Sequence, residues 1–277
     1  MHKQLETLFD LSGRVAVITG GSGLLGYMHA QVIAAAGGTP VLVDLASAEP
    51  HAKAEQLAAS YDVDALGCVT DITSPTQVKV LLETVLGRFG AVDILINNAA
   101  NNPNVEVGSD RTRSRLEHFT LEAWEADLAV GLTGAFLCSQ VLGSEMARRG
   151  RGVILNVASD LAVIAPDQRL YRQEGLPADR QPVKPVTYSV VKTALIGLTR
   201  YLATYWADSG VRVNAISPGC VENGQPEEFV TRLSSLIPLS RMAHVNEYQG
   251  AILFLCSDAS SYMTGANLVI DGGRSSW

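Results

Sequence analysis

Short runs of apolar and β-branched residues alternate along the chain with longer stretches of helical pattern. The predicted strands are 14–19, 40–44, 65–69, 92–97, 152–158, 211–217 and 267–270. The predicted helices are 24–36, 49–60, 75–89 with Ser74 as its N-cap, a long one within 121–149, 188–208 and 247–257. Continuous apolar strands separated by helices are typical of a parallel sheet covered on both faces. The pattern therefore predicts a doubly wound α/β fold of three layers, with about seven strands.

Two stretches interrupt this rhythm, at about 101–118 and 166–185, and both are long, polar and rich in arginine. Each follows the end of a predicted strand, where open α/β sheets bind their ligands. Long loops inside a compact domain are often functional. We therefore expect residues 1–277 to form one domain, with these two insertions over its active site.

Composition excludes several classes of protein. The formal net charge is -7 and the pI about 5.2, which argues against nucleic acid as a partner because phosphate binding needs a basic surface. No uninterrupted apolar run reaches the roughly 20 residues that span a bilayer, so no membrane partner is expected. The first ten residues lack the apolar core of a signal peptide, which predicts a cytoplasmic protein. Neither the four cysteines nor the five histidines have metal-binding spacing, so no metal is expected.

A glycine-rich loop directly follows the first predicted strand. Residues 21–26 read GSGLLG, a GxGxxG motif that opens a helix. Glycine lets the backbone approach a pyrophosphate, and the helix amino end offers N–H groups to that anion. The motif in this position predicts a Rossmann-type dinucleotide site; the alternative is a glycine turn that binds nothing.

Asp44 ends the second predicted strand, 18 residues after Gly26. A carboxylate there accepts hydrogen bonds from the adenosine ribose hydroxyls and repels a 2′-phosphate. Because no Arg or Lys follows Asp44 immediately, NAD is favoured over NADP as cofactor. A plain turn or N-cap role for Asp44 remains the alternative.

Several motifs then follow in a fixed order, and together they resemble the short-chain dehydrogenase/reductase family over nearly the whole chain. They are Thr19-Gly20, Asp71-Ile72, Asn97-Asn98-Ala99-Ala100, Asn156-Val157-Ala158-Ser159, Tyr188-Ser-Val-Val-Lys192, Ser217-Pro218-Gly219 and the terminal Ile270-Asp271-Gly272-Gly273. Any one of these motifs is common by chance, whereas the ordered set is not.

The resemblance implies a role for each matching residue. Ser159 would hydrogen-bond the substrate oxygen, Tyr188 would be the general acid/base, and Lys192 would bind the nicotinamide ribose. The implied cofactor-binding residues are Gly20, Ser22, Gly23, Leu24, Leu25, Gly26, Asp44, Asp71, Ile72, Asn97, Asn98, Ala99, Tyr188, Lys192, Pro218, Gly219 and Val221. Asp71 and Ile72 would hold the adenine, Asn97 and Ala99 would line the cofactor channel, and Pro218 and Gly219 would shape the nicotinamide pocket.

Elementary chemistry supports the Tyr188 and Lys192 pair. A free tyrosine has a pKa near 10, too high for a base at neutral pH, and a nearby ammonium favours the phenolate. Lys192 lies four residues after Tyr188, one helical turn away on the same face. An ordinary helix pair is the alternative. Tyr171 competes for the catalytic role, but Gly175 stands four residues beyond it, so Tyr171 is expected in the inserted loop, where it contacts substrate or is merely structural.

Three departures from the family pattern matter. Leu24 stands where single-domain members usually have a glycine, so the loop reads TGxxGxxG, as in longer members that act on nucleotide sugars. Gly131 replaces the asparagine that holds a water in the family's proton relay, and the glycine either leaves room for water or the relay differs. The third departure is the insertion at 166–185, which lengthens the gap between Ser159 and Tyr188. It carries Arg169, Arg172 and Arg180, which either pair with neighbouring acids or bind an anionic or hydroxylated substrate.

These patterns predict an NAD-dependent oxidoreductase that moves a hydride between nicotinamide and a secondary alcohol or ketone, such as a sugar or polyol. Tyr171, Arg169 and Arg172 are the candidate substrate residues. The loop and insertion are also similar to those of bacterial surface-sugar and flagellin-modification dehydrogenases. The resemblance implies a homotetramer or homodimer. The rival functions are a nucleotide-sugar epimerase or dehydratase that keeps its NAD, and a non-catalytic NAD(H)-binding regulator.

Overall fold

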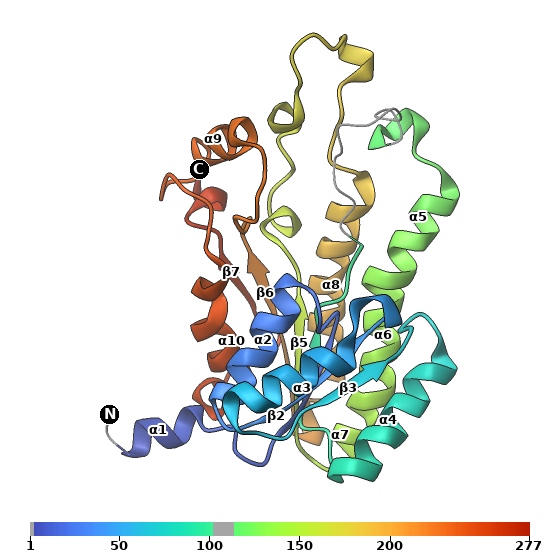
Figure 1. Ribbon diagram of the computed structural model, residues 1–277, viewed down its shortest axis with the longest axis vertical. Coiled ribbons are helices and arrows are strands. Elements are labelled where there is room, and N and C mark those ends of the chain that lie inside the picture. Colours follow the sequence, from blue (N-terminus) through green and yellow to red (C-terminus); the bar gives the residue numbers. More distant parts are fainter. Residues whose placement is uncertain (1–2, 102–113) are drawn as a thin grey trace.

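The computed structural model describes residues 3–101 and 114–277 and confirms the predicted sheet (Figure 1). Seven parallel strands lie in the order β3-β2-β1-β4-β5-β6-β7. They are β1 (Val15–Thr19), β2 (Thr39–Asp44), β3 (Leu66–Val69), β4 (Ile94–Asn97), β5 (Gly152–Val157), β6 (Val211–Pro218) and β7 (Asn267–Ile270). Each predicted strand is present, with ends shifted by at most two residues.

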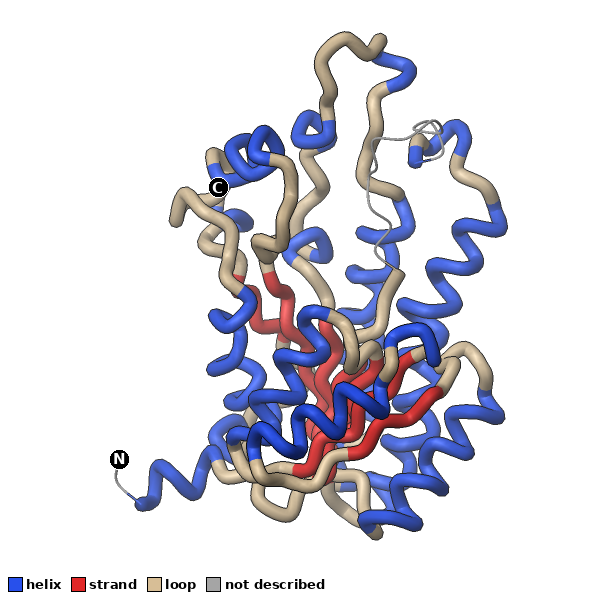
Figure 2. The backbone as a smooth tube through the Cα atoms, in the orientation of Figure 1, coloured by secondary structure: helices blue, strands red, loops and turns tan. Residues whose placement is uncertain are grey.

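Helices cover both faces of the sheet, as Figure 2 shows. They are α1 (Lys3–Phe9), α2 (Leu24–Ala35), α3 (Pro50–Tyr61), α4 (Pro75–Phe89), α5 (Leu121–Leu128), α6 (Gly134–Cys138), α7 (Ser144–Arg148), α8 (Val186–Tyr205), α9 (Glu227–Ser234) and α10 (Gln249–Cys256). Side chains of β1 alternate between two cores because successive strand residues point to opposite faces. Ala16 and Ile18 pack with α2 and α10, whereas Val15 and Val17 pack with α4, α7 and α8.

Some local predictions hold and others need correction. The hydroxyl of Ser74 accepts a hydrogen bond from Gln77 N at 3.4 Å and caps α4, as its position before Pro75 predicts. α8 begins at Val186, two residues before Tyr188, because Pro185 sets its start. The short helices α1 and α9 were not predicted, since they span only 7 and 8 residues, too few to show a helical period clearly.

The helix predicted within 121–149 runs from Leu121 to Arg148 and contains two π-helical turns, Ala129–Thr133 and Ser139–Gly143. By length and composition this helix is apolar enough to cross a membrane, although it holds no uninterrupted apolar run of that length. Its residues Cys138, Leu142 and Met146 are fully buried against the sheet. Since the core helix of a soluble protein passes the same test, the finding is weak evidence for a membrane span.

The strand order reverses at β1, which has β2 on one side and β4 on the other. At such a switch point the loops after the strands part and leave a crevice for ligands. The segment 166–185, yellow in Figure 1, rises beyond this edge of the sheet. Arg115 ties the two insertions together, because its guanidinium donates to the carbonyl oxygens of Ala178 (3.1 Å) and Gln181 (3.4 Å). The same insertion also contains Arg111 and Arg113, which lie outside the described residues.

Candidate active site

The glycine-rich loop connects β1 to α2 and leaves the helix amino end open. Gly23, the N-cap residue, gives α2 no side-chain cap. A Cβ at Gly26 would lie 2.0 Å from the carbonyl oxygen of Gly20, so only glycine fits there. The hydroxyl of Ser22 is buried and has no hydrogen-bond partner among the described residues. An open helix amino end beside an unpartnered hydroxyl fits the pyrophosphate of a dinucleotide.

Asp44 stands at the carboxyl end of β2, beside this loop. Its two oxygens accept hydrogen bonds from Ser22 N (3.0 Å) and Leu45 N (2.9 Å). Each carboxylate oxygen keeps a further lone pair, which a ribose hydroxyl can use. Lys53, which the sequence analysis did not single out, donates to the carbonyl oxygen of Ser22 at 2.5 Å. The adenosine end of the crevice therefore holds a cation as well as an anion.

Behind the loop, Asn97 and Asn98 organise the ends of β4 and β1. Asn98 donates from its side chain to the carbonyl oxygens of Thr19 (3.0 Å) and Gly20 (3.1 Å). Asn97 is 3% exposed and donates to Asn156 Oδ1 at 2.8 Å. The structure thus places Asn97 beneath the crevice rather than on its wall, where it supports β5.

The remaining predicted cofactor residues also lie at the carboxyl edge of the sheet. Asp71 follows β3, and its carboxylate accepts from the backbone N–H (2.9 Å) and hydroxyl (2.7 Å) of Thr73. Ile72 is buried against the long helix, close to Gly134. Pro218 ends β6, and Gly219 N donates to the carbonyl oxygen of Ile270 at 2.8 Å. Ala99 and Val221 occupy the same edge through the loops after β4 and β6, and Leu25 does so from the first turn of α2.

The three predicted catalytic residues come from two elements and meet beside the crevice. Ser159 follows β5 and is 5% exposed, while Tyr188 and Lys192 lie one turn apart on α8. The Lys192 ammonium lies 5.9 Å from the centre of the Tyr188 ring and donates to the carbonyl oxygen of Val157 at 2.7 Å. Burial raises the pKa of Tyr188 to about 12, and the neighbouring hydroxyl of Ser159 opposes part of that rise.

A second lysine, missed by the sequence analysis, lies against the same tyrosine. The Lys184 ammonium sits 3.9 Å from the centre of the Tyr188 ring, within the range of a cation–π contact. Burial lowers the pKa of Lys184 to about 8. Burial also lowers the pKa of Lys192 to about 8, and the charge of Lys184 adds to that fall. Lys184 lies at the end of the inserted segment, four residues before Tyr188. The insertion thus places a second cation against the tyrosine ring.

Gly131 lies next to Tyr188 and Lys192, but side chains fill most of the space that its missing side chain leaves. A Cβ on Gly131 would lie 2.6 Å from Cγ1 of Val191. The cavity that remains measures about 10 Å³ and is lined in part by Gly131, Val191, Tyr188, Lys192 and Asp127. That volume is close to the minimum for a single water molecule.

An ion pair, also missed by the sequence analysis, lies behind Ser159. Arg274 Nη1 donates to Asp160 Oδ2 at 2.7 Å, and the two side chains are 8% and 4% exposed. The other oxygen of Asp160 accepts the hydroxyl of Ser159 at 2.8 Å. No motif drew attention to either residue, because each becomes informative only when the other is beside it.

The candidate substrate residues of the insertion separate into two groups. Tyr171 is brought to the site: it packs on Phe229 of α9, and burial and the nearby Tyr188 and Asp160 raise its pKa well above the usual value. Arg169 points away into solvent, since its side chain is 73% exposed and paired with Asp167 at 2.7 Å. Arg172 is exposed as well.

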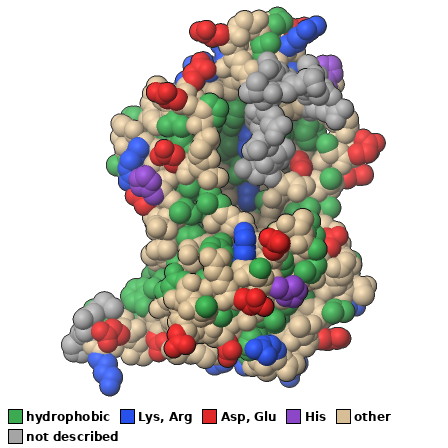
Figure 3. Space-filling view, viewed as in Figure 1, with side chains coloured by type: hydrophobic (Ala, Val, Ile, Leu, Met, Phe, Trp, Pro, Cys, Tyr) green, Lys and Arg blue, Asp and Glu red, His purple; other side chains and the backbone are tan. Residues whose placement is uncertain are grey.

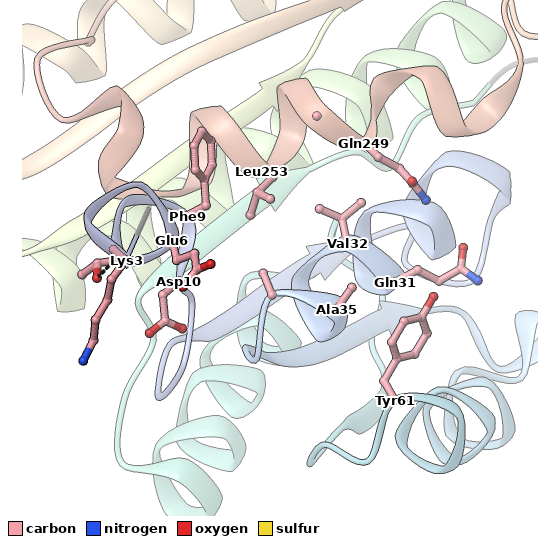
Figure 4. A pocket seen from close by; sticks show the side chains of 13 residues that line it. Lys3, Glu6, Phe9, Asp10, Gln31, Val32, Ala35, Tyr61, Gln249 and Leu253 are labelled. Carbon is pink, nitrogen blue, oxygen red and sulfur yellow. Dashed lines mark hydrogen bonds between the residues drawn. The ribbon is translucent and has the colours of Figure 1, made fainter. Parts of the chain in front are cut away.

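Figure 3 shows Lys and Arg side chains within the hollowed middle of the face. Among residues 3–101 and 114–277, no three His, Cys, Asp or Glu side chains are placed to hold a metal ion. A larger hollow of about 700 Å³ lies between α1, α2 and α10, lined by Gln31, Tyr61 and Gln249 among others (Figure 4). None of the candidate catalytic or cofactor residues lines it.

Comparisons with known proteins cover both halves of the chain. A family model described as short chain dehydrogenase matches residues 14–171, and one described as Enoyl-(Acyl carrier protein) reductase matches residues 178–275. D-threitol dehydrogenase of Mycolicibacterium smegmatis is 34% identical over 96% of this chain and 94% of its own length.

Solved structures match over nearly the full length. A gluconate 5-dehydrogenase from Burkholderia cenocepacia, in complex with NADP and tartrate, superposes with a TM-score of 0.85 at 28% identity, over 99% of each chain. A xylitol dehydrogenase bound to NAD+ superposes with a TM-score of 0.81 at 26% identity, over 95% of this chain and 99% of its own.

Proposed function

The chain belongs to the short-chain dehydrogenase family, and from that premise we propose that it is an NAD-dependent dehydrogenase of polyhydroxy compounds. It is an oxidoreductase by family. The proposed reaction interconverts a secondary alcohol of a polyol or sugar derivative and the matching ketone. The observation that carries the proposal is the contact between Ser159 and Tyr188, with the Lys192 ammonium 5.9 Å from the tyrosine ring.

A bound nicotinamide would supply the hydride acceptor for oxidation and the hydride donor for reduction. The open amino end of α2 and the unpartnered hydroxyl of Ser22 fit its pyrophosphate. Asp44 would accept the adenosine ribose hydroxyls, and Lys192 would bind the nicotinamide ribose. We infer NAD rather than NADP because the Asp44 carboxylate repels a 2′-phosphate. Lys53 opposes that preference, since it places a positive charge on the same loop.

Tyr188 would exchange the proton with the substrate oxygen. In oxidation its phenolate takes the hydroxyl proton, and in reduction its hydroxyl returns a proton to the carbonyl oxygen. The ammonium groups of Lys184 and Lys192 favour the phenolate, which offsets the burial that raises the pKa of Tyr188 to about 12. Ser159 would orient the substrate oxygen.

The substrate class rests on the chemistry of the site and on the relatives. Tyr171, Ser159, Asp160 and Lys184 surround Tyr188 with groups that donate to or accept from hydroxyls. The relatives described above are named for D-threitol, gluconate and xylitol, which all carry several hydroxyl groups. A polyol with adjacent secondary hydroxyls is the substrate that best uses such a pocket.

Substitution of Tyr188 by Phe tests the proposal. The absorbance of reduced nicotinamide would be followed with NAD and with NADP against threitol, xylitol, gluconate, a simple secondary alcohol and nucleotide sugars. We expect NADH to form with one or more polyols, and Tyr188→Phe to lower the turnover by roughly 10²- to 10⁴-fold, the usual contribution of general acid–base catalysis. NADH binding, measured by fluorescence, should stay unchanged because the substitution leaves the glycine-rich loop, Asp44 and Lys192 intact.

Three outcomes would contradict the proposal. Full turnover in Tyr188→Phe would remove the acid/base role from Tyr188. Conversion of a nucleotide sugar without net NADH would instead support the epimerase or dehydratase alternative, and NADH binding without any turnover would support a regulator.

A further inference from the structure

Beside Tyr188, Ser159 is hydrogen-bonded to a buried ion pair. Ser159 is close enough to Tyr188 to affect its pKa, Ser159 Oγ donates to Asp160 Oδ1 at 2.8 Å, and Arg274 Nη1 donates to Asp160 Oδ2 at 2.7 Å. Ser159, Asp160 and Arg274 are 5%, 3% and 8% exposed. Tyr188 stands at the reacting end of this set of contacts, and Arg274, which follows β7, stands at the other end.

The local backbone is shaped to hold this pair. Gly273 has a φ of +89°, which favours glycine, and it turns the chain after β7 toward the site. Asp271 fixes that turn, since its carboxylate oxygens accept Gly273 N (2.9 Å) and Ser275 N (2.8 Å). Leu161 N donates to Asp160 Oδ1 at 2.8 Å, so both charged partners are held from their own segments.

A buried ion pair is weak evidence for stability, because desolvation of the two charges offsets much of their attraction. A pair next to a reacting group has a second effect, through the hydrogen that it orders. Ser159 has a single hydroxyl hydrogen, and here it is donated to Asp160. The Ser159 oxygen is then left as an acceptor, which suits a protonated Tyr188. A Tyr188 phenolate would need that same hydrogen for itself.

We propose that Asp160 and Arg274 are positioning residues: Asp160 takes the hydroxyl hydrogen that Ser159 could otherwise give to a Tyr188 phenolate and thereby favours protonated Tyr188, while Arg274 limits this effect by pairing with the carboxylate. The pair thus sets how readily the site gives a proton to a ketone or takes one from an alcohol. The inference rests on the proposed acid/base role of Tyr188.

Other charged and titratable groups face Tyr188 from each neighbouring segment. They are Asp160 after β5, Tyr171 and Lys184 in the insertion, Asp127 on α5, Lys192 on α8, Cys220 after β6 and Arg274 after β7. The two lysines favour the phenolate and Asp160 disfavours it. Of these groups, only Asp160 also competes for the hydrogen of Ser159.

Two substitutions that each remove one charge of the pair should move the pKa of Tyr188 in opposite directions. Asp160→Asn removes the negative charge and weakens the acceptor, so the pKa of Tyr188 should fall. Arg274→Gln leaves the carboxylate buried and uncompensated, so the pKa of Tyr188 should rise. A charge within about 4–6 Å of a titrating group shifts its pKa by roughly 1–3 units, so we expect a shift of about one unit in each direction.

The measurement is the pH dependence of polyol oxidation by the NAD-loaded enzyme, for wild type and both variants. We expect the acidic limb of the kcat profile to move to lower pH in Asp160→Asn and to higher pH in Arg274→Gln. Asp93→Asn is the matched control, because Asp93 is a 5% exposed carboxylate paired with Arg151 at 2.9 Å. It directly precedes β4, so it lies at the amino ends of the strands, away from the site at their carboxyl ends. That control should lower the melting temperature without moving the profile.

A titration without turnover separates this inference from the proposed function. The tyrosinate absorbance of NAD-loaded protein is recorded against pH, and the same curve for the matching Tyr188→Phe protein is subtracted. Opposite shifts of the difference curve in the two variants support the inference even when no polyol is oxidised, in which case only the substrate class fails. Unchanged curves, or shifts in one common direction, would overturn it.

Discussion

The substitution Gly131→Asn would introduce the asparagine of the family pattern. It tests whether neighbouring side chains have filled the space that this asparagine would occupy. Gly131 lies in the π-helical turn Ala129–Thr133, and Cγ1 of Val191 would be 2.6 Å from its Cβ. Ordinary contacts between carbon atoms are about 3.5–4.0 Å, so the new side chain would overlap Val191 by roughly 1 Å. Valine in a helix has one strongly preferred rotamer and does not move aside readily.

The magnitude follows from these contacts. Overpacking a filled interior costs about 1–3 kcal/mol. Replacing glycine within a helix returns a few tenths of a kcal/mol, because asparagine is only slightly better than glycine there. We therefore expect Gly131→Asn to lower the free energy of unfolding by roughly 1–2.5 kcal/mol, which corresponds to a melting temperature lower by about 2–10 °C in a domain of this size.

Thermal unfolding followed by circular dichroism measures this change. Gly87→Asn on α4 is the control, since a Cβ at Gly87 meets no atom within 4 Å and the same substitution should leave the melting temperature unchanged or slightly raised. Adding Val191→Ala to Gly131→Asn should recover part of the loss by removing the overlap. An unchanged melting temperature in Gly131→Asn would refute the conclusion that Val191 fills the space of the missing side chain.

Two further predictions concern the cofactor and the response to acid. Asp44→Ala should weaken NADH binding and strengthen NADPH binding, measured by fluorescence titration, because the 2′-phosphate no longer meets a carboxylate and Lys53 remains nearby; an unchanged preference would assign that selection to other residues. Burial lowers the pKa of His29 from about 6.5 to about 3, so the folded protein holds this side chain neutral. His29 therefore contributes stability above pH 6.5 that is lost as the pH falls toward 3. His29→Leu should make the melting temperature less sensitive to pH in that range, and equal sensitivity in both proteins would contradict this account.

The fold was predictable from the sequence because its signals are local. Most strands are built on short runs of apolar residues, and Ser74-Pro75 marks the start of α4. The predictions failed where a pattern is too short to recognise: α9 has only 8 residues, and it packs against the insertion through Phe229. The site roles of the predicted residues, the dimer or tetramer, the choice of NAD and the cytoplasmic location stay predictions.

The site was predictable only where a motif spans a few neighbouring residues. Tyr188 and Lys192 share one helical turn, so their spacing alone places them together. Asp160 and Arg274 stand 114 residues apart, and no local pattern links them. Lys184 was passed over because it belongs to an irregular insertion, where spacing says little about direction. Arginine content was a misleading signal there, since Arg169 pairs with its neighbour Asp167.

The separation of Asp160 and Arg274 also bears on how the protein folds. Their ion pair needs β7 to have joined β6 at the edge of the sheet, and closing a long loop delays contacts of this kind. A chain that has assembled β1 to β5 would already carry the glycine loop and Asp44, yet Ser159 would have no fixed partner beyond Asp160. We therefore expect a refolding chain to bind the cofactor before it shows the catalytic pH profile of the native enzyme. The return of that native profile would then mark the pairing of β7 with β6.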